Sequence, residues 1–263
     1  MRDLDWQGIG AQALKIPLTQ WKTLVACIAS ASVLSAVIIF CTGVAASFLS
    51  DSRQQWFQEQ GFNYTFLAVC FISATIFQWC WMTALWHNTM RHCLTFLFHA
   101  GFWNFAALML LILLAQGLAS SIKALILAAS ESLLLGHGRG PQISVVGVMF
   151  ASLGLQAWIF ARLMIWPACV VVRRQLCSPI KIWHATDGLF WDFVFLSLRV
   201  QLPIPVVFGI LGAVVLLLVR SANLLMALSA GGAIYAIAAM NAAGLLAYFE
   251  VIGKREAAAA PAE

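Results

Sequence analysis

Long apolar runs with almost no charge follow one another along the chain, and short polar segments separate them. A bilayer core is about 30 Å thick and a helix rises 1.5 Å per residue, so one crossing needs roughly 20 such residues. Six runs are long enough: residues 23–49, 62–86, 94–121, 141–172, 200–219 and 221–249. Their apolar residues are continuous, whereas barrel strands would alternate apolar and polar positions. We therefore predict an all-α integral membrane protein with six transmembrane helices in one domain, residues 23–250.

Three flanking segments do not have the pattern of membrane spans. Residues 1–22 place Trp6, Ile9, Leu14 and Trp21 among a few charges, which predicts a short amphipathic helix in the membrane interface. Residues 122–140 have a similar pattern on the opposite side of the membrane and end in a Gly-rich turn. We expect residues 251–263 to form a flexible cytoplasmic tail.

Composition excludes a water-soluble globule. Hydrophobic residues make up 62% of the chain and charged residues 10%, and the mean hydropathy is +0.91; an average soluble domain is roughly half apolar and about a quarter charged. The seven cysteines include no Cys-x-x-Cys pair, so we expect neither a disulfide framework nor a redox motif. No residue pattern reveals a reaction, and we expect a protein that is not an enzyme.

The distribution of Lys and Arg predicts the orientation. With six spans both termini lie on one side, and the connections on that side hold 11 of the 15 Lys and Arg residues. Since cytoplasmic loops carry the excess of positive charge, we predict that both termini are cytoplasmic.

The segment 162–199 carries the candidate interaction surface. Basic and aromatic side chains gather there: Arg162, Arg173, Arg174, Lys181, His184, Arg199, Trp166, Trp183 and Trp191. Each basic group near an anionic membrane surface contributes about 1 kcal/mol. We predict that this cytoplasmic rim contacts anionic lipid headgroups or a protein partner. The alternative is that the same charges only set the topology.

Local signals divide this segment into helices. The fourth span is expected to continue to Val172 and to end at Arg173-Arg174, which places Arg162 near the inner boundary, paired to a carboxylate or snorkelling to phosphates. Ser178-Pro179 predicts the start of a short helix, and Thr186 or Asp187 is expected to cap the next one. Asp192 is then the acid that we expect to pair with Arg162 or Arg199.

Several stretches resemble a known membrane domain. They are Arg162-Leu163, Pro167–Val172, Ile182–Trp191 and the lead-in Ala13–Lys22. Together they resemble the membrane domain attached to some bacterial glycerophosphoryl diester phosphodiesterases, which also occurs as stand-alone six-helix inner-membrane proteins of poorly defined role. The chain departs from that pattern at Ile182, where the family usually has Ser, and at Arg173-Arg174, which replaces an acidic residue. The resemblance implies the six-helix fold and a bacterial inner-membrane location, but no phosphodiesterase activity, because the catalytic barrel is absent.

Two other functional classes stay open as alternatives. His87, His92 and His99 lie near the junction of the second and third spans and are weak candidates for a haem or metal site in a redox subunit. No carboxylate or Cys set joins them at metal-ligand spacing, so we expect no metal and no cofactor. A small-solute transporter or channel is the other alternative, although the spans lack the buried acids typical of ion-coupled transport.

The expected partners are membrane lipids with anionic headgroups, and nucleic acid is not among them. A membrane-protein partner or a second copy of the chain is an alternative. The last span places small residues largely at intervals of three or four, which favours close packing within the protein or dimerisation: Ser229, Gly232, Ala233, Ala236, Ala239 and Ala243.

Overall fold

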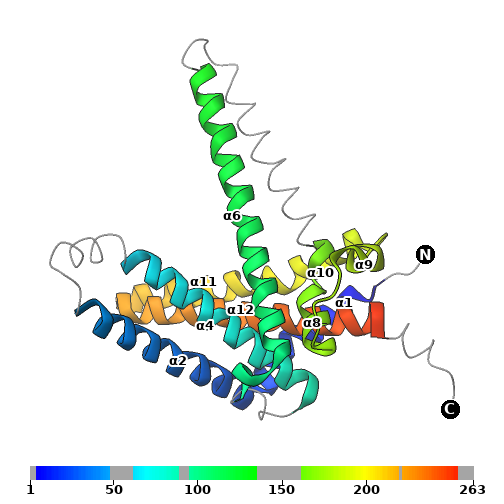
Figure 1. Ribbon diagram of the computed structural model, residues 1–263, viewed down its shortest axis with the longest axis horizontal. Helices are drawn as coiled ribbons and strands as arrows, with labels where there is room; N and C mark the ends of the chain where they lie inside the picture. The colour runs from blue at the N-terminus through cyan, green and yellow to red at the C-terminus, as the bar shows by residue number, and fades with distance from the viewer. Residues whose placement is uncertain (1–3, 48–61, 89–94, 135–160, 219–220, 254–263) are drawn as a thin grey trace.

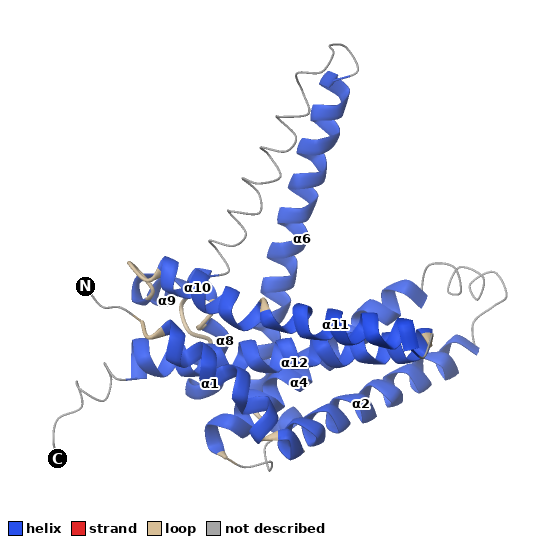
Figure 2. Ribbon diagram, turned by 180° about the vertical axis from the view of Figure 1, so that it is seen from behind, coloured by secondary structure: helices blue, strands red, loops and turns tan. Residues whose placement is uncertain are grey.

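The computed structural model describes residues 4–47, 62–88, 95–134, 161–218 and 221–253, and within these ranges all regular structure is helical. Figures 1 and 2 show the elements α1 (Trp6–Thr19), α2 (Trp21–Ser47), α4 (Phe62–His87), η2 (Phe96–Phe98), α6 (Ala100–Leu134), α8 (Trp166–Arg173), α9 (Pro179–Ala185), α10 (Phe190–Gln201), α11 (Pro203–Leu218) and α12 (Ala222–Tyr248), followed by the π-helical turn η3 (Phe249–Gly253). The all-α prediction is confirmed for this part of the chain.

Five helical segments are long and apolar enough to cross a membrane, which indicates a multi-pass membrane protein. They are Trp21–Cys41, Leu67–His87, Ala100–Leu118, Phe190–Leu218 and Ala222–Gly253. The first, second and last of these agree with predicted spans. Most of the predicted fourth span, residues 141–160, lies outside the described residues, as do the turn at 136–141 and the tail residues 254–263.

Most of the helices lie lengthwise beside one another (Figure 1). α2 packs on α4, and α12 packs on both α4 and α11. α6 rises from this group at a steep angle in both views. α1, α8, α9 and α10 gather at one end, where α4 ends and α6 begins, and the largest fully buried side chains include Trp81, Tyr248, Phe105 and Phe193.

α6 differs from the predicted third span at both of its ends. The helix begins at Ala100 and not at the predicted residue 94, because His99 has an extended backbone (φ −97°, ψ 120°) that separates α6 from η2. The helix then continues to Leu134, so the expectation of a separate interfacial segment from residue 122 is wrong. The physical reason is that no Pro or Gly interrupts the chain between Gly117 and Gly136.

The expected continuous helix up to Val172 is also wrong. Residues 161–163 are helical, residues 164–165 form a turn, and α8 begins at Trp166. Pro167 has no N–H to donate to the carbonyl of Leu163, so the helical bonding is interrupted at this point. α8 ends at Arg173 as predicted, and Arg174 closes it in the left-handed conformation (φ 56°).

α1 and α10 lie side by side and run in the same direction. The backbone N–H of Leu4 donates to the Asp192 carboxylate, and the rings of Trp6 and Phe195 stack at 5.4 Å. One turn further along, Gly10 faces the side chain of Arg199. α1 is also tied to α12, because the Tyr235 hydroxyl donates to the carbonyl of Leu14.

Candidate functional site

The chain reverses direction after α8, and this turn builds the basic end of the molecule. Arg174 is left-handed, so residues 175–178 fold back along α8. Trp166 Nε1 donates to the carbonyl of Cys177 at 2.9 Å, and Cys169 and Cys177 form a disulfide with their Cα atoms 6.6 Å apart. The expectation that the cysteines would form no disulfide is therefore wrong for this pair.

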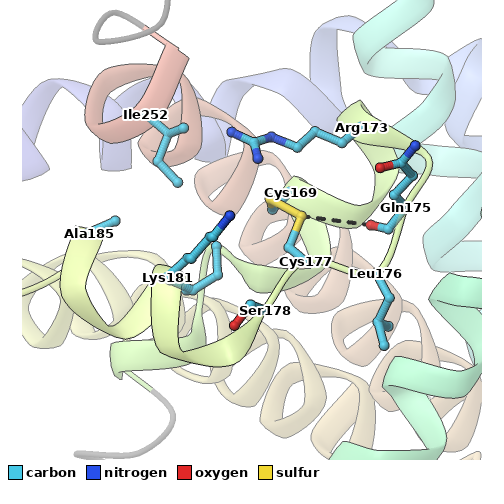
Figure 3. A pocket seen from close by; sticks show the side chains of 10 residues that line it. Cys169, Arg173, Gln175, Leu176, Cys177, Ser178, Lys181, Ala185 and Ile252 are labelled. Carbon is cyan, nitrogen blue, oxygen red and sulfur yellow. Dashed lines mark hydrogen bonds between the residues drawn. A yellow bond between two sulfur atoms is a disulfide. The ribbon is translucent and has the colours of Figure 1, made fainter.

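A pocket of about 370 Å³ opens beside this disulfide (Figure 3). Arg173 from α8 and Lys181 from α9 supply its charged lining, and Ile252 from η3 closes one wall. None of the described residues that line it is Asp or Glu. The arrangement provides a cationic, partly apolar recess, and an anionic group such as a phosphate complements it.

Arg162 is buried and belongs to the framework of this end. Its side chain is 10% exposed, and Nη2 donates to Asp187 Oδ1 at 2.8 Å. Nη1 donates to the carbonyl of Trp183 at 3.3 Å, and the guanidinium lies 5.0 Å from the centre of the Trp183 ring. The expectation that Arg162 pairs with a carboxylate is confirmed.

The acid of this pair is not the predicted one. The hydrogen bond and the charge of Arg162 hold the pKa of Asp187 below its ordinary value of 3.8. Asp192 accepts from the Leu4 N–H at 3.3 Å and makes no ion pair with Arg162 or Arg199, all of which lie in the described ranges. The prediction for Asp192 is therefore wrong. The turn at 164–165 and the short α9 place Asp187, and not Asp192, beside the Arg162 guanidinium.

Thr186 connects the same segments through its hydroxyl. Its Oγ1 lies 3.2 Å from the carbonyl oxygen of Arg162 and 3.1 Å from that of Trp183, and the residue is fully buried. α9 begins after Ser178 with Pro179 in its first turn, as predicted, although the Ser178 side chain makes no capping bond. α10 begins after Leu189 without a side-chain cap, so the expected capping by Thr186 or Asp187 is wrong.

The histidine candidates do not form a common site in the described residues. Arg174 Nη2 donates to His87 Nε2 at 3.3 Å, whereas His99 Nε2 lies 3.2 Å from Thr95 Oγ1. His92 lies outside the described residues. Within them, no group of three or more His, Cys, Asp or Glu side chains is placed to hold a metal ion.

The predicted surface therefore divides into four parts. Trp166 is 4% exposed and Arg162 is 9% exposed, so both are buried structural residues and not part of the contact surface. Arg174 is exposed but holds the turn, because its carbonyl accepts from Asn104 Nδ2 and its side chain reaches His87. Arg173 and Lys181 share the pocket, while Arg199 and the exposed Trp191 lie on α10.

No protein-family model, curated protein or solved structure matches the chain.

Sequence reasoning assigned the wrong role to Thr186 and Asp187, because it expected one of them to cap α10. The sequence offered one signal. Thr186 and Asp187 directly follow the short helix predicted to start at Ser178-Pro179. The pairing itself depends on the turn at 164–165, which the apolar pattern does not reveal.

Proposed function

We propose that this protein is a non-catalytic scaffold or accessory subunit of a bacterial inner membrane, and that its basic end binds the phosphate groups of anionic lipids. In this proposal the chain crosses the membrane six times, with both termini in the cytoplasm. α1 and α9 lie at the membrane boundary. The resemblance to the phosphodiesterase membrane domain is consistent with this role and stays a prediction.

The pocket between α8 and α9 carries the proposal. It combines two cationic side chains, Arg173 and Lys181, with apolar walls, and the described part of its lining contains no acidic residue. Both cations are on exposed residues, where a headgroup can reach them. Two basic groups near an anionic surface contribute about 2 kcal/mol together.

Native mass spectrometry tests this proposal with two lipids of the same chain length, phosphatidylglycerol and phosphatidylcholine. We expect the wild-type protein to retain phosphatidylglycerol through delipidation, and we expect the double variant Arg173→Gln/Lys181→Gln to retain at least one molecule fewer. Arg174 is left unchanged, because its backbone and side chain hold the turn.

The matched control is Lys22→Gln, which removes an exposed cation that lies outside this pocket and should leave phosphatidylglycerol retention unchanged. Equal phosphatidylglycerol retention by the wild type and the Arg173/Lys181 variant would contradict the proposal and leave these charges a role in topology alone. If a membrane protein co-purified with the wild type but not with the Arg173/Lys181 variant, the pocket would be assigned to a protein partner instead.

A further inference from the structure

A long groove lies between α1, α10, α11 and α12, away from the pocket described above. Its volume is about 1040 Å³, at the upper end of the range of about 300–1,000 Å³ for small-molecule sites. Its lining is apolar except for Lys15, Arg199 and the hydroxyl of Tyr235. That hydroxyl donates to the Leu14 carbonyl, so the wall of the groove is largely hydrocarbon in character.

The two cations of the groove have no ion-pair partner in the part of the chain that the structure describes. No Asp or Glu is among the described residues that line the groove, and the Asp192 carboxylate on α10 accepts a hydrogen bond from the Leu4 N–H. Gly10 keeps Arg199 close to α1, because a Cβ at that position would lie 2.8 Å from Arg199 Cδ. The groove thus has two uncompensated positive charges, both on exposed residues.

The apolar part of the groove has the length of one lipid chain. Nine residues separate Arg199 from Phe208 along α10 and α11, which is about 14 Å of helix. Half of a hydrocarbon core measures about 15 Å. Leu202 and Val207 line this stretch and are 58% and 51% exposed, so it is open from the side.

Aromatic rings mark the end of the groove that lies near the first turns of α1 and α10. Phe195 lies between Trp6, at 5.4 Å, and Trp191, at 6.1 Å. Trp191 is 65% exposed. Exposed Trp rings favour the headgroup layer of a membrane, so this end of the groove fits the polar boundary and the Phe208 end fits the hydrocarbon.

We propose that this groove binds one anionic phospholipid of the surrounding bilayer. The lipid phosphate lies between Lys15 and Arg199, and one acyl chain follows Leu202 and Val207 toward Phe208. The site is separate from the pocket of Arg173 and Lys181 and shares none of its residues.

Photo-crosslinking in nanodiscs tests this site. The discs consist of phosphatidylcholine with a small fraction of phosphatidylglycerol whose acyl chain carries a diazirine, and the labelled residues are mapped by mass spectrometry. We expect labels concentrated on the groove, at Leu18, Leu202 and Val207. Lys15→Gln/Arg199→Gln should lower this labelling by about 30-fold, because two cations near a phosphate are lost.

Three controls keep the result specific. Lys15→Arg/Arg199→Lys keeps both charges and should keep the labelling, and Arg173→Gln/Lys181→Gln should leave it unchanged. Val207→Trp fills the chain path while both cations stay, and it should also remove the labels at Leu202.

Equal labelling by diazirine phosphatidylcholine would overturn the proposal, as would labels spread evenly over other exposed apolar residues such as Leu217 and Leu218. Unchanged labelling in Lys15→Gln/Arg199→Gln would overturn it as well. Each of these results leaves the test of the Arg173/Lys181 pocket unaffected, since that test uses different residues.

Discussion

Thr186 is fully buried, and its single hydroxyl proton can serve one of three carbonyl oxygens, those of Arg162, Ile182 and Trp183. Val has nearly the same shape but no hydroxyl, so Thr186→Val removes the donor and leaves buried acceptors behind. We expect the free energy of unfolding to fall by about 1–3 kcal/mol. Denaturant titration of the protein in micelles measures this change.

Thr83 provides the matched control for that substitution. It is 3% exposed, and its Oγ1 has no hydrogen-bond partner among the described residues. Thr83→Val should therefore leave the free energy of unfolding unchanged or raise it slightly, because it removes an unsatisfied buried hydroxyl. A similar loss in both variants would show that the Thr186 hydrogen bonds do not stabilise the turn.

Asp187 makes the Arg162 ion pair sensitive to pH. Its pKa is lower in the folded protein than its ordinary value of 3.8, so the pair stabilises the fold above that value. The stabilisation disappears as the pH falls through the lowered pKa. We expect Asp187→Asn to reduce the melting temperature at neutral pH, and we expect the gap to the wild type to close below about pH 4.

Asp192→Asn is the control for this pH series. An Asn side chain keeps an oxygen that can accept from the Leu4 N–H, so its melting temperature should stay near that of the wild type. The Arg162–Asp187 pair would lose its assigned role if both variants melted alike at neutral pH, or if the Asp187→Asn gap persisted in acid.

Packing between α11 and α12 depends on one of two neighbouring glycines. A Cβ at Gly232 would lie 2.9 Å from Cγ of Phe208, whereas nothing lies within 4 Å of a Cβ at Gly231. Ala is the better helix former, so Gly231→Ala should stabilise α12 by up to about 1 kcal/mol. Gly232→Ala forces the Phe208 ring aside and should cost about 1–3 kcal/mol.

Thermal unfolding of the two single variants in the same detergent measures this difference. The comparison also tests how the small-residue face of α12 is used, because Gly232, Ala239 and Ala243 are buried within the protein whereas Ser229 and Ala233 are exposed. If Gly231→Ala were the more harmful change, the exposed side of α12 would be the one that packs, against a second copy.

The elements differ in how far the sequence could predict them. α2, α4 and α12 follow from charge-free apolar runs, because length and the cost of burying charge in hydrocarbon fix a span locally. The end of α6 could not be predicted in this way, since an apolar run without Pro or Gly continues a helix beyond the thickness of a membrane. The turn at 164–165 was also missed, although Pro167 marks its position.

The candidate site was predictable in its residue types more than in its contacts. Arg173 and Lys181 lie on the predicted surface and share a pocket. Arg162 and Trp166 were assigned to that surface too, yet both are buried, because the turn after α8 folds back onto Trp166 and α9 folds back onto Arg162. The periodicity of apolar residues does not predict that the chain folds back onto Arg162 and Trp166.

At the scale of the whole molecule, the first and the last long helical segments of the described chain are packed together. α1 packs on α12, and the start of α1 and the end of α12 lie at the same end of the molecule, beside α8, α9 and α10 (Figure 1). The prediction of six crossings requires both ends of the chain to lie on the same side of the membrane. The connections assigned to this end hold 11 of the 15 Lys and Arg residues, which favours the cytoplasm.

The Cys169–Cys177 disulfide provides an independent test of that orientation. Disulfides persist in the periplasm but are rare in the cytoplasm, where glutathione and thioredoxin keep thiols reduced. If the basic end faces the cytoplasm, both cysteines should be thiols in living cells and should pair only after extraction into air. We therefore expect acid quenching of intact cells, followed by alkylation of the denatured protein, to label both residues without a reductant.

After purification in air without an alkylating agent, the denatured protein should show two more reactive thiols with a reductant than without one. Cys169→Ser should abolish this effect of the reductant. An impermeant maleimide added to intact cells should label neither cysteine. A disulfide that is already present in quenched cells would place the basic end in the periplasm, against its arginines and lysines. It would reverse the topology of every span without changing the packing at Arg162, because that packing depends on contacts within the protein and not on the side of the membrane.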